Sequence, residues 1–112
     1  MLLLTWECTN HLFGTTSNPH NIKRVPGGSS GGEGCLIAAK CSPGGVGTDI
    51  GGSIRIPAAY CGIYGIKYTN TRVSQTNSLF PNVSGRTGAM IKATYGPMCR
   101  SADDLITMSK AF

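Results

Sequence analysis

The sequence predicts an α/β fold, because segments with helical and with strand character alternate along its central part. Residues 31–41 are mostly small and apolar and predict a helix, and residues 53–60 predict a second, shorter helix. The short apolar runs at 46–49 and 63–68 predict a strand between these helices and another after them. Helices that alternate with strands are typical of the α/β class.

Glycine is concentrated between Gly27 and Pro57, a stretch that holds ten of the sixteen glycines. A glycine inside a helix or strand costs about 0.5–1 kcal/mol relative to alanine, so this density indicates a role for the backbone itself. The pair Ser29-Ser30 follows one Gly-Gly pair, and Ser53 follows another. Each precedes a predicted helix, so we expect these hydroxyls to lie where backbone N–H groups converge and favour an anion or a developing oxyanion.

The flanking segments are predicted to be less regular. Residues 6–26 form an irregular approach with an Asn-Pro turn signal, and the polar residues 69–87 form a loop. Residues 93–99 are predicted only as the segment that connects to the last helix. That helix is predicted to begin after Ser101, which with Asp104 three residues later resembles a capping box.

The charge pattern excludes some classes of partner. The chain carries ten basic and five acidic side chains, a formal net charge of +5, with only Lys23 and Arg24 adjacent. No aromatic residues interleave with the basic ones, which predicts a solvated surface and no nucleic-acid partner. No apolar run approaches the roughly 20 residues that cross a bilayer, and Met1–Leu4 is too short for a signal-peptide core. We therefore expect an intracellular protein without a transmembrane segment in this chain.

The cysteines and histidines predict neither a metal site nor a serine–histidine pair. Five cysteines is an odd number, and none forms a C-x-x-C pair: Cys8, Cys35, Cys41, Cys61 and Cys99. Free, buried thiols are the expected state, including Cys35 and Cys41, and no metal or cofactor is expected. The two histidines, His11 and His20, lie in the irregular approach segment and are expected at the surface.

Two stretches closely resemble the pattern of the amidase signature family. Gly27–Glu33 is Gly-Gly-Ser-Ser-Gly-Gly-Glu, and Gly47–Pro57 is Gly-Thr-Asp-Ile-Gly-Gly-Ser-Ile-Arg-Ile-Pro, with a matching gap between them. The resemblance begins near Trp6 and covers nearly all of the chain, but only a central slice of the family fold. It implies that residues 1–112 are a partial, incomplete amidase signature domain, part of a mixed β-sheet flanked by helices.

The resemblance also implies a catalytic arrangement, a Ser–cis-Ser–Lys triad. Ser53 matches the nucleophile, and Ser29 matches the bridging serine, preceded by a cis Gly28–Ser29 peptide bond. The matching oxyanion-hole donors are the backbone N–H groups of Ile50, Gly51, Gly52 and Ser53. The matching supporting residues are Ser30, Thr48, Asp49 and Arg55. For Arg55, an internal ion pair and a direct contact with substrate stay open as alternatives.

The base of that triad has no counterpart in this chain. The family's triad lysine lies well upstream of the bridging serine, on a separate segment. The lysine before Ser29 in this chain, Lys23, stands in the approach loop, and Lys40, Lys67 and Lys92 match no base position either. We therefore expect the triad lysine to be missing from these 112 residues.

Within the family, the chain is most similar to the animal fatty-acid amide hydrolases, and to their second type in particular. Three segments carry this similarity: Trp6-Glu7, the run that begins at Glu33, and Gly96–Arg100. This implies hydrolysis of non-peptide amide carbon–nitrogen bonds, with a small lipid amide as substrate and membrane association of the full-length protein. Two alternatives stay open: the amidase subunit of a tRNA-dependent amidotransferase, and a non-catalytic remnant or gene-model fragment. The rest of the reading frame distinguishes them.

Overall fold

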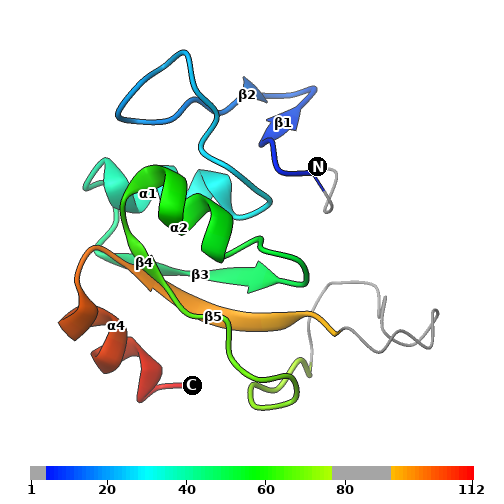
Figure 1. Ribbon diagram of the computed structural model, residues 1–112, viewed down its shortest axis with the longest axis vertical. Coiled ribbons are helices and arrows are strands. Elements are labelled where there is room, and N and C mark those ends of the chain that lie inside the picture. The colour runs from blue at the N-terminus through cyan, green and yellow to red at the C-terminus, as the bar shows by residue number, and fades with distance from the viewer. Residues whose placement is uncertain (1–4, 77–91) are drawn as a thin grey trace.

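The computed structural model describes residues 5–76 and 92–112, which form three layers (Figure 1). A three-stranded sheet has the order β3-β5-β4, and a separate hairpin pairs β1 with β2. Helices α1 and α2 lie on one side of the sheet and α4 on the other. The strands are β1 Thr9–Asn10, β2 Gly14–Thr15, β3 Gly44–Asp49, β4 Tyr64–Gly65 and β5 Thr94–Cys99, and the helices are α1 Gly31–Ala38, α2 Arg55–Cys61 and α4 Ala102–Ser109.

The α/β class is confirmed, and the strand pairs among the described residues are antiparallel. The predicted helix 53–60 is found as α2, and the predicted strand 46–49 is longer, beginning at Gly44. The predicted strand 63–68 is reduced to the two residues of β4. Of the predicted loop 69–87, residues 69–76 form bends and turns, and the remainder lies outside the described residues.

The first helix is shorter than expected, because the chain leaves it through a Schellman motif. The N–H of Cys41 donates to Leu36 O at 2.8 Å, and that of Lys40 donates to Ile37 O at 3.1 Å. Lys40 has a φ of 63°, the left-handed conformation that usually selects glycine at this position. Helix α1 therefore ends at Ala38. The Leu36 side chain on this helix is half exposed, so the described residues do not enclose the apolar helix on every side.

The last helix begins as the sequence predicted. The N–H of Asp104 donates to Ser101 Oγ at 3.1 Å, and the Ser101 hydroxyl donates to Asp104 Oδ2 at 2.6 Å. The cap thus satisfies one of the free N–H groups in the first turn. No helix among residues 5–76 and 92–112 has the length and apolar character needed to cross a membrane.

The central strand β5 was not predicted, because Pro97 stands in it. Proline donates no ladder hydrogen bond and is uncommon between two neighbouring strands. Here Ile66 N donates to Pro97 O at 3.2 Å, so the side of Pro97 without an N–H faces β4, the shorter neighbour. On the other side, β3 pairs with β5 along its whole length, with Val46 opposite Pro97.

The core is built around Ile54, the residue that follows Ser53. Ile54 is fully buried with Ile37, Ala58 and Met98. One glycine from each strand of the sheet faces it. A Cβ on these glycines would lie 2.8, 2.7 and 3.2 Å from the Ile54 side chain, in the order Gly47 of β3, Gly65 of β4 and Gly96 of β5. The three glycines form a socket for Ile54, so the turn before α2 is fixed against the sheet.

We expect Gly96→Ala to lower the free energy of unfolding by about 1–3 kcal/mol, a typical cost of overpacking. The added methyl group would overlap Ile66 O, a backbone atom that cannot rotate away. Gly32→Ala is the matched control, because nothing lies within 4 Å of its Cβ position in α1, and it should stabilise by about 0.5–1 kcal/mol. Urea denaturation of the intact protein measures both. A Gly96→Ala variant as stable as the wild type would contradict the β4–β5 packing.

Candidate active site

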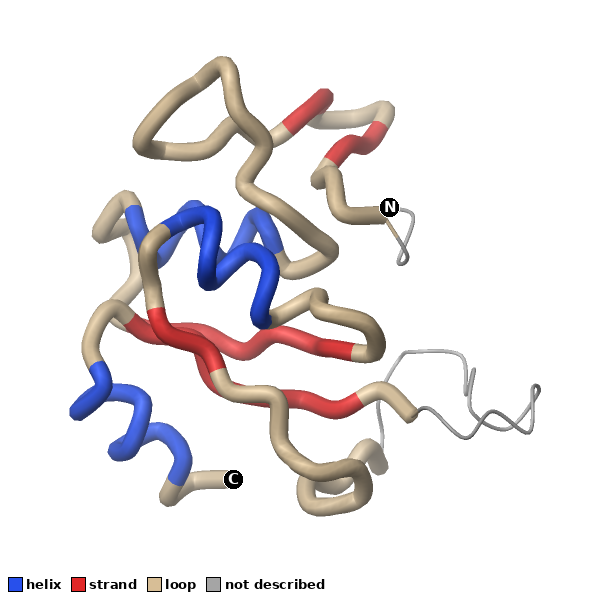
Figure 2. Tube along the Cα trace, viewed as in Figure 1, coloured by secondary structure: helices blue, strands red, loops and turns tan. Residues whose placement is uncertain are grey.

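The two serine segments predicted from the sequence meet in the structure. Each is a loop that runs into a helix, the first into α1 and the second into α2 (Figure 2). The N–H of Ser30 donates to Ser53 O at 3.1 Å and joins the loops directly. The peptide bond between Gly28 and Ser29 is cis, as the resemblance implied. The candidate nucleophile and the candidate bridging serine therefore stand on adjoining backbone segments.

The second loop is organised by the carboxylate of Asp49, which has no exposed surface. Its oxygens accept hydrogen bonds from the N–H groups of Gly52 at 2.8 Å, Ile54 at 3.0 Å and Arg55 at 3.3 Å. The Arg55 guanidinium adds two more, from Nε at 3.1 Å and from Nη2 at 3.0 Å. Of the two alternatives for Arg55, the structure shows the internal ion pair.

The pKa of the Asp49 carboxyl is lowered by this environment. Burial alone would raise its pKa, because it disfavours the charged form. The hydrogen bonds from the Arg55 side chain and from the backbone N–H groups of Ile54, Gly52 and Arg55 act in the opposite direction and outweigh burial. Asp49 is therefore a buried anion at neutral pH, held by five hydrogen bonds.

Not every N–H group at the start of α2 is free, because Asp49 accepts hydrogen bonds from those of Ile54 and Arg55. Among the four candidate oxyanion donors, the N–H of Gly52 is taken by Asp49. The N–H groups of Ile50, Gly51 and Ser53 have no acceptor within the part of the chain that the structure describes. Within residues 5–76 and 92–112, three of the four candidate donors thus stay available.

Ser30 stands at the N-cap position of α1, yet its hydroxyl does not cap that helix. Instead Thr48 N donates to Ser30 Oγ at 3.2 Å, and the hydroxyl donates to Thr48 O at 3.4 Å. Both Thr48 groups lie on the outer edge of β3, away from β5. Ser30 therefore attaches the first serine loop to the strand that ends at Asp49, and the two bonds require a hydroxyl at position 30 but only backbone groups at position 48.

A cavity of about 430 Å³ opens beside the first serine loop. Ser29, only 8% exposed, lines it together with Glu7 and Glu33. The Ser29 hydroxyl has no hydrogen-bond partner among residues 5–76 and 92–112. Ser53 is half-buried and does not line this cavity. The structure therefore places Ser29 and Ser53 near one another without showing a bond between their hydroxyls.

No lysine of the described residues lines the cavity beside Ser29. Lys23 lines a different cavity, and Lys40 follows the end of α1. No group of three or more histidine, cysteine, aspartate or glutamate side chains among the described residues is arranged to hold a metal ion. Both histidines, His11 and His20, are exposed, as predicted.

Sequence reasoning missed the part that two cysteines play in the first serine loop. The thiol of Cys8 donates to Ser29 O at 3.4 Å and lies 3.6 Å from Gly27 O, and that of Cys61 donates to Pro26 O at 3.6 Å. Burial raises the pKa of the Cys61 thiol to about 12. Nothing in the spacing of these cysteines indicates this role, because their partners are backbone carbonyls of another segment.

The prediction of free thiols is confirmed for all five cysteines, including Cys35 and Cys41. The expectation that the thiols are buried is only partly right. Cys61 and Cys99 are buried, whereas Cys41 is exposed because it lies in the turn that leaves α1.

We expect Asp49→Asn to lower the free energy of unfolding at pH 7 by about 1.5–3 kcal/mol, the range for hydrogen bonds to a charged group. The folded-state pKa of Asp49 lies below its ordinary value of 3.8, so its stabilisation is complete above that pH and is lost as the pH falls through the lower value. The difference between wild type and variant should therefore shrink on acidification.

Chemical denaturation of the intact protein at a series of pH values measures this difference. Asp103→Asn is the matched control, because Asp103 is an exposed carboxylate in the first turn of α4, and its effect should stay within about 0.5 kcal/mol. A difference for Asp49→Asn that does not change between neutral and strongly acidic pH would contradict a buried, charged Asp49.

Comparisons with known proteins identify the family of this chain. The family model described as Amidase matches residues 2–112. The chain is 49% identical over 109 residues to fatty-acid amide hydrolase 1 of Sus scrofa, covering 97% of this chain and 18% of that relative. It is 45% identical over 109 residues to fatty-acid amide hydrolase 2 of Homo sapiens, covering 97% of this chain and 20% of the relative.

Among solved structures, a fatty acid amide hydrolase matches with a TM-score of 0.84 at 44% identity, covering 97% of this chain and 19% of that one. The chain thus spans about a fifth of the length of the relatives it matches. The resemblance to fatty-acid amide hydrolases is confirmed, and these comparisons do not separate the first type from the second. With a family match that extends from residue 2 to residue 112, the chain belongs to the amidase family.

Proposed function

We propose that the protein carrying this chain hydrolyses non-peptide amide bonds, with fatty-acid amides as its substrates. The observation that supports this most is the direct bond between the two serine loops, from Ser30 N to Ser53 O at 3.1 Å. It holds the candidate nucleophile beside the candidate bridging serine. The substrate class rests on the relatives reported above, which carry the name fatty-acid amide hydrolase.

In the proposed mechanism, Ser53 Oγ attacks the amide carbonyl carbon and Ser29 Oγ accepts the proton that Ser53 loses. Ser29 at the same time passes its own proton to a neutral lysine, the general base. The lysine then returns a proton to the leaving amine through the same serine. Water hydrolyses the acyl-enzyme by the reverse route, which regenerates Ser53.

The developing oxyanion is held by backbone N–H groups in the turn before α2. We assign the direct contacts to Ile50, Gly51 and Ser53, because the N–H of Gly52 already donates to Asp49. Gly52 has a φ of +127°, and a Cβ there would lie 2.6 Å from Ile56 Cδ1, so this position requires glycine. Asp49 and Arg55 act by holding the turn, and Ser30 with Thr48 holds the adjoining loop.

We place the base lysine on a segment of the protein outside these 112 residues. The cavity beside Ser29 is where the lysine side chain would enter, since Ser29 lines that space and its hydroxyl has no partner among the described residues. Lysine has an ordinary pKa near 10.4, so a base that is neutral at pH 7 must be desolvated or placed near other positive charge, which the rest of the protein would have to supply. Intracellular location and membrane association of the whole protein belong to this proposal and rest on the resemblance described from the sequence.

We expect a fluorophosphonate, which reacts with activated serines, to label Ser53 in the intact protein. Ser53→Ala should abolish the labelling, because the reacting oxygen is removed. Ser29→Ala should slow acylation by about 10²–10⁴-fold, the usual contribution of a positioned proton-transfer group, without loss of the fold. Ser74→Ala is the matched control, since this exposed serine bonds only to Thr76. Mass spectrometry identifies the labelled residue, and undiminished labelling in Ser53→Ala would refute the assignment.

We expect the isolated 112-residue polypeptide to hydrolyse no fatty-acid amide above background and to unfold without a cooperative transition. No described lysine stands beside Ser29, and large apolar side chains are exposed, including Leu12 at 86%, Phe13 at 88% and Ile22 at 81%. Turnover assays and thermal unfolding of the purified polypeptide test this. Turnover that disappears in Ser53→Ala would contradict it and assign the base role to Lys23 or Lys92.

A further inference from the structure

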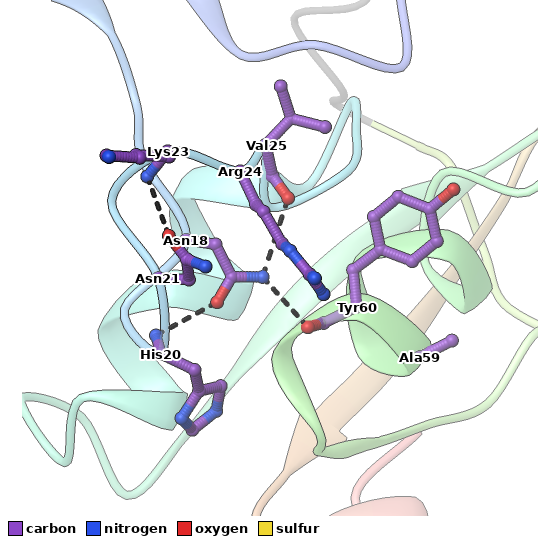
Figure 3. Close-up of a pocket in the computed structure, with 8 residues that line it drawn as sticks. All are labelled: Asn18, His20, Asn21, Lys23, Arg24, Val25, Ala59 and Tyr60. Atoms are coloured by element: carbon purple, nitrogen blue, oxygen red, sulfur yellow. Dashed lines mark hydrogen bonds between the residues drawn. The ribbon is translucent and has the colours of Figure 1, made fainter.

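A second cavity, of about 790 Å³, lies apart from the serine loops. One wall is the loop 18–25, and the other is the end of α2 with Ala59 and Tyr60 (Figure 3). None of its lining residues lines the cavity beside Ser29. Its volume falls in the range of about 300–1,000 Å³ that is typical of small-molecule sites.

The loop is pre-formed by its own hydrogen bonds. Asn18 N donates to Arg24 O at 2.9 Å, Asn21 N donates to Asn18 O at 3.1 Å, and Arg24 N donates to Asn21 O at 2.9 Å. The buried Asn18 amide also donates to Tyr60 O at 2.8 Å, which fixes the loop on α2. A ligand would therefore meet a wall that needs no ordering on binding.

Two side-chain acceptors of the wall, the amide oxygens of Asn18 and Asn21, already accept hydrogen bonds. Asn18 Oδ1 accepts from His20 N at 2.9 Å, and Asn21 Oδ1 accepts from Lys23 N at 3.0 Å. His20 Nε2 lies 2.8 Å from the carbonyl oxygen of Cys61, which only accepts, so this nitrogen carries the proton. These three polar atoms of the wall are therefore already bonded within the protein.

Its charged donors, in contrast, are free. The side chains of Lys23 and Arg24 form no ion pair or hydrogen bond within the described residues, and no aspartate or glutamate of those residues lines the cavity. Figure 3 shows Arg24 extending across the cavity toward Tyr60, whereas Lys23 points outward on the other side of the loop. Arg24 is thus placed to contact a ligand, and Lys23 to attract one from the rim.

We propose that this cavity binds a small organic oxyanion, a phosphate or carboxylate group on an apolar or aromatic body. The planar guanidinium of Arg24 presents paired donors that match the two oxygens of such a group. The Tyr60 ring, 57% exposed, offers an apolar surface beside it for the rest of the ligand. The site is separate from the proposed hydrolytic chemistry.

Isothermal titration calorimetry of the intact protein tests this, with phenyl phosphate, benzoate and inorganic phosphate as probes. Phenyl phosphate or benzoate should bind. The probe with the lower Kd shows whether the cavity prefers a phosphate or a carboxylate group. Arg24→Gln should weaken binding by about tenfold or more, and Lys23→Gln by less, since it acts from the rim. Both variants keep the backbone bonds that shape the loop. Tyr60→Ala should weaken phenyl phosphate binding but not inorganic phosphate binding.

Two controls separate this cavity from other positive groups and from the serine site. Lys110→Gln removes an exposed cation beyond the end of α4, and Ser53→Ala removes the candidate nucleophile. Both should bind the probes as the wild type does. The proposal is overturned if the wild type binds neither phenyl phosphate nor benzoate at millimolar concentration, if Arg24→Gln binds them equally well, or if Ser53→Ala abolishes binding.

Discussion

The buried carboxylate of Asp49 is the interaction on which the rest of the site depends. It ends β3 and caps the first turn of α2 through the N–H groups of Ile54 and Arg55. A buried, unpaired charge would be costly, and the guanidinium of Arg55 together with three backbone donors offsets that cost. The turn between strand and helix, which carries Gly51, Gly52 and Ser53, has its shape because both of its ends are bound to the same side chain.

The packing of Ile54 completes this arrangement from the other side. Asp49 fixes the polar groups of the turn, and the socket formed by Gly47, Gly65 and Gly96 fixes its apolar side chain. The glycines here allow close approach rather than unusual backbone conformations, because a Cβ at any of the three would press on Ile54. Ser53 lies between Gly52, whose N–H bonds to Asp49, and Ile54, whose side chain packs on the sheet.

The hydrogen bonds of Ser30 connect the first serine loop to the same framework. Its backbone N–H bonds to Ser53 O, and its hydroxyl bonds to Thr48, one residue before Asp49. The outer edge of β3 is occupied in part by this contact and by the Ser42 hydroxyl, which donates to Gly44 O at 2.6 Å. An edge strand with its polar groups satisfied by side chains is less available for pairing with another strand. The supporting serine therefore has a structural role that is visible without any substrate.

The sequence by itself determined the local features: the two glycine-rich serine loops, the helices that follow them, and the cap of α4. Each of these depends on residues a few positions apart, such as Ser101 and Asp104, whose bonds form within one turn. The tertiary structure decided what depends on distant segments. Pro97 enters a central strand because its side without a donor faces the short β4, and Ser30 bonds to β3 instead of its own helix. Local helix and strand propensities predict neither outcome. In both cases the deciding partner lies on a neighbouring strand that only folding brings close.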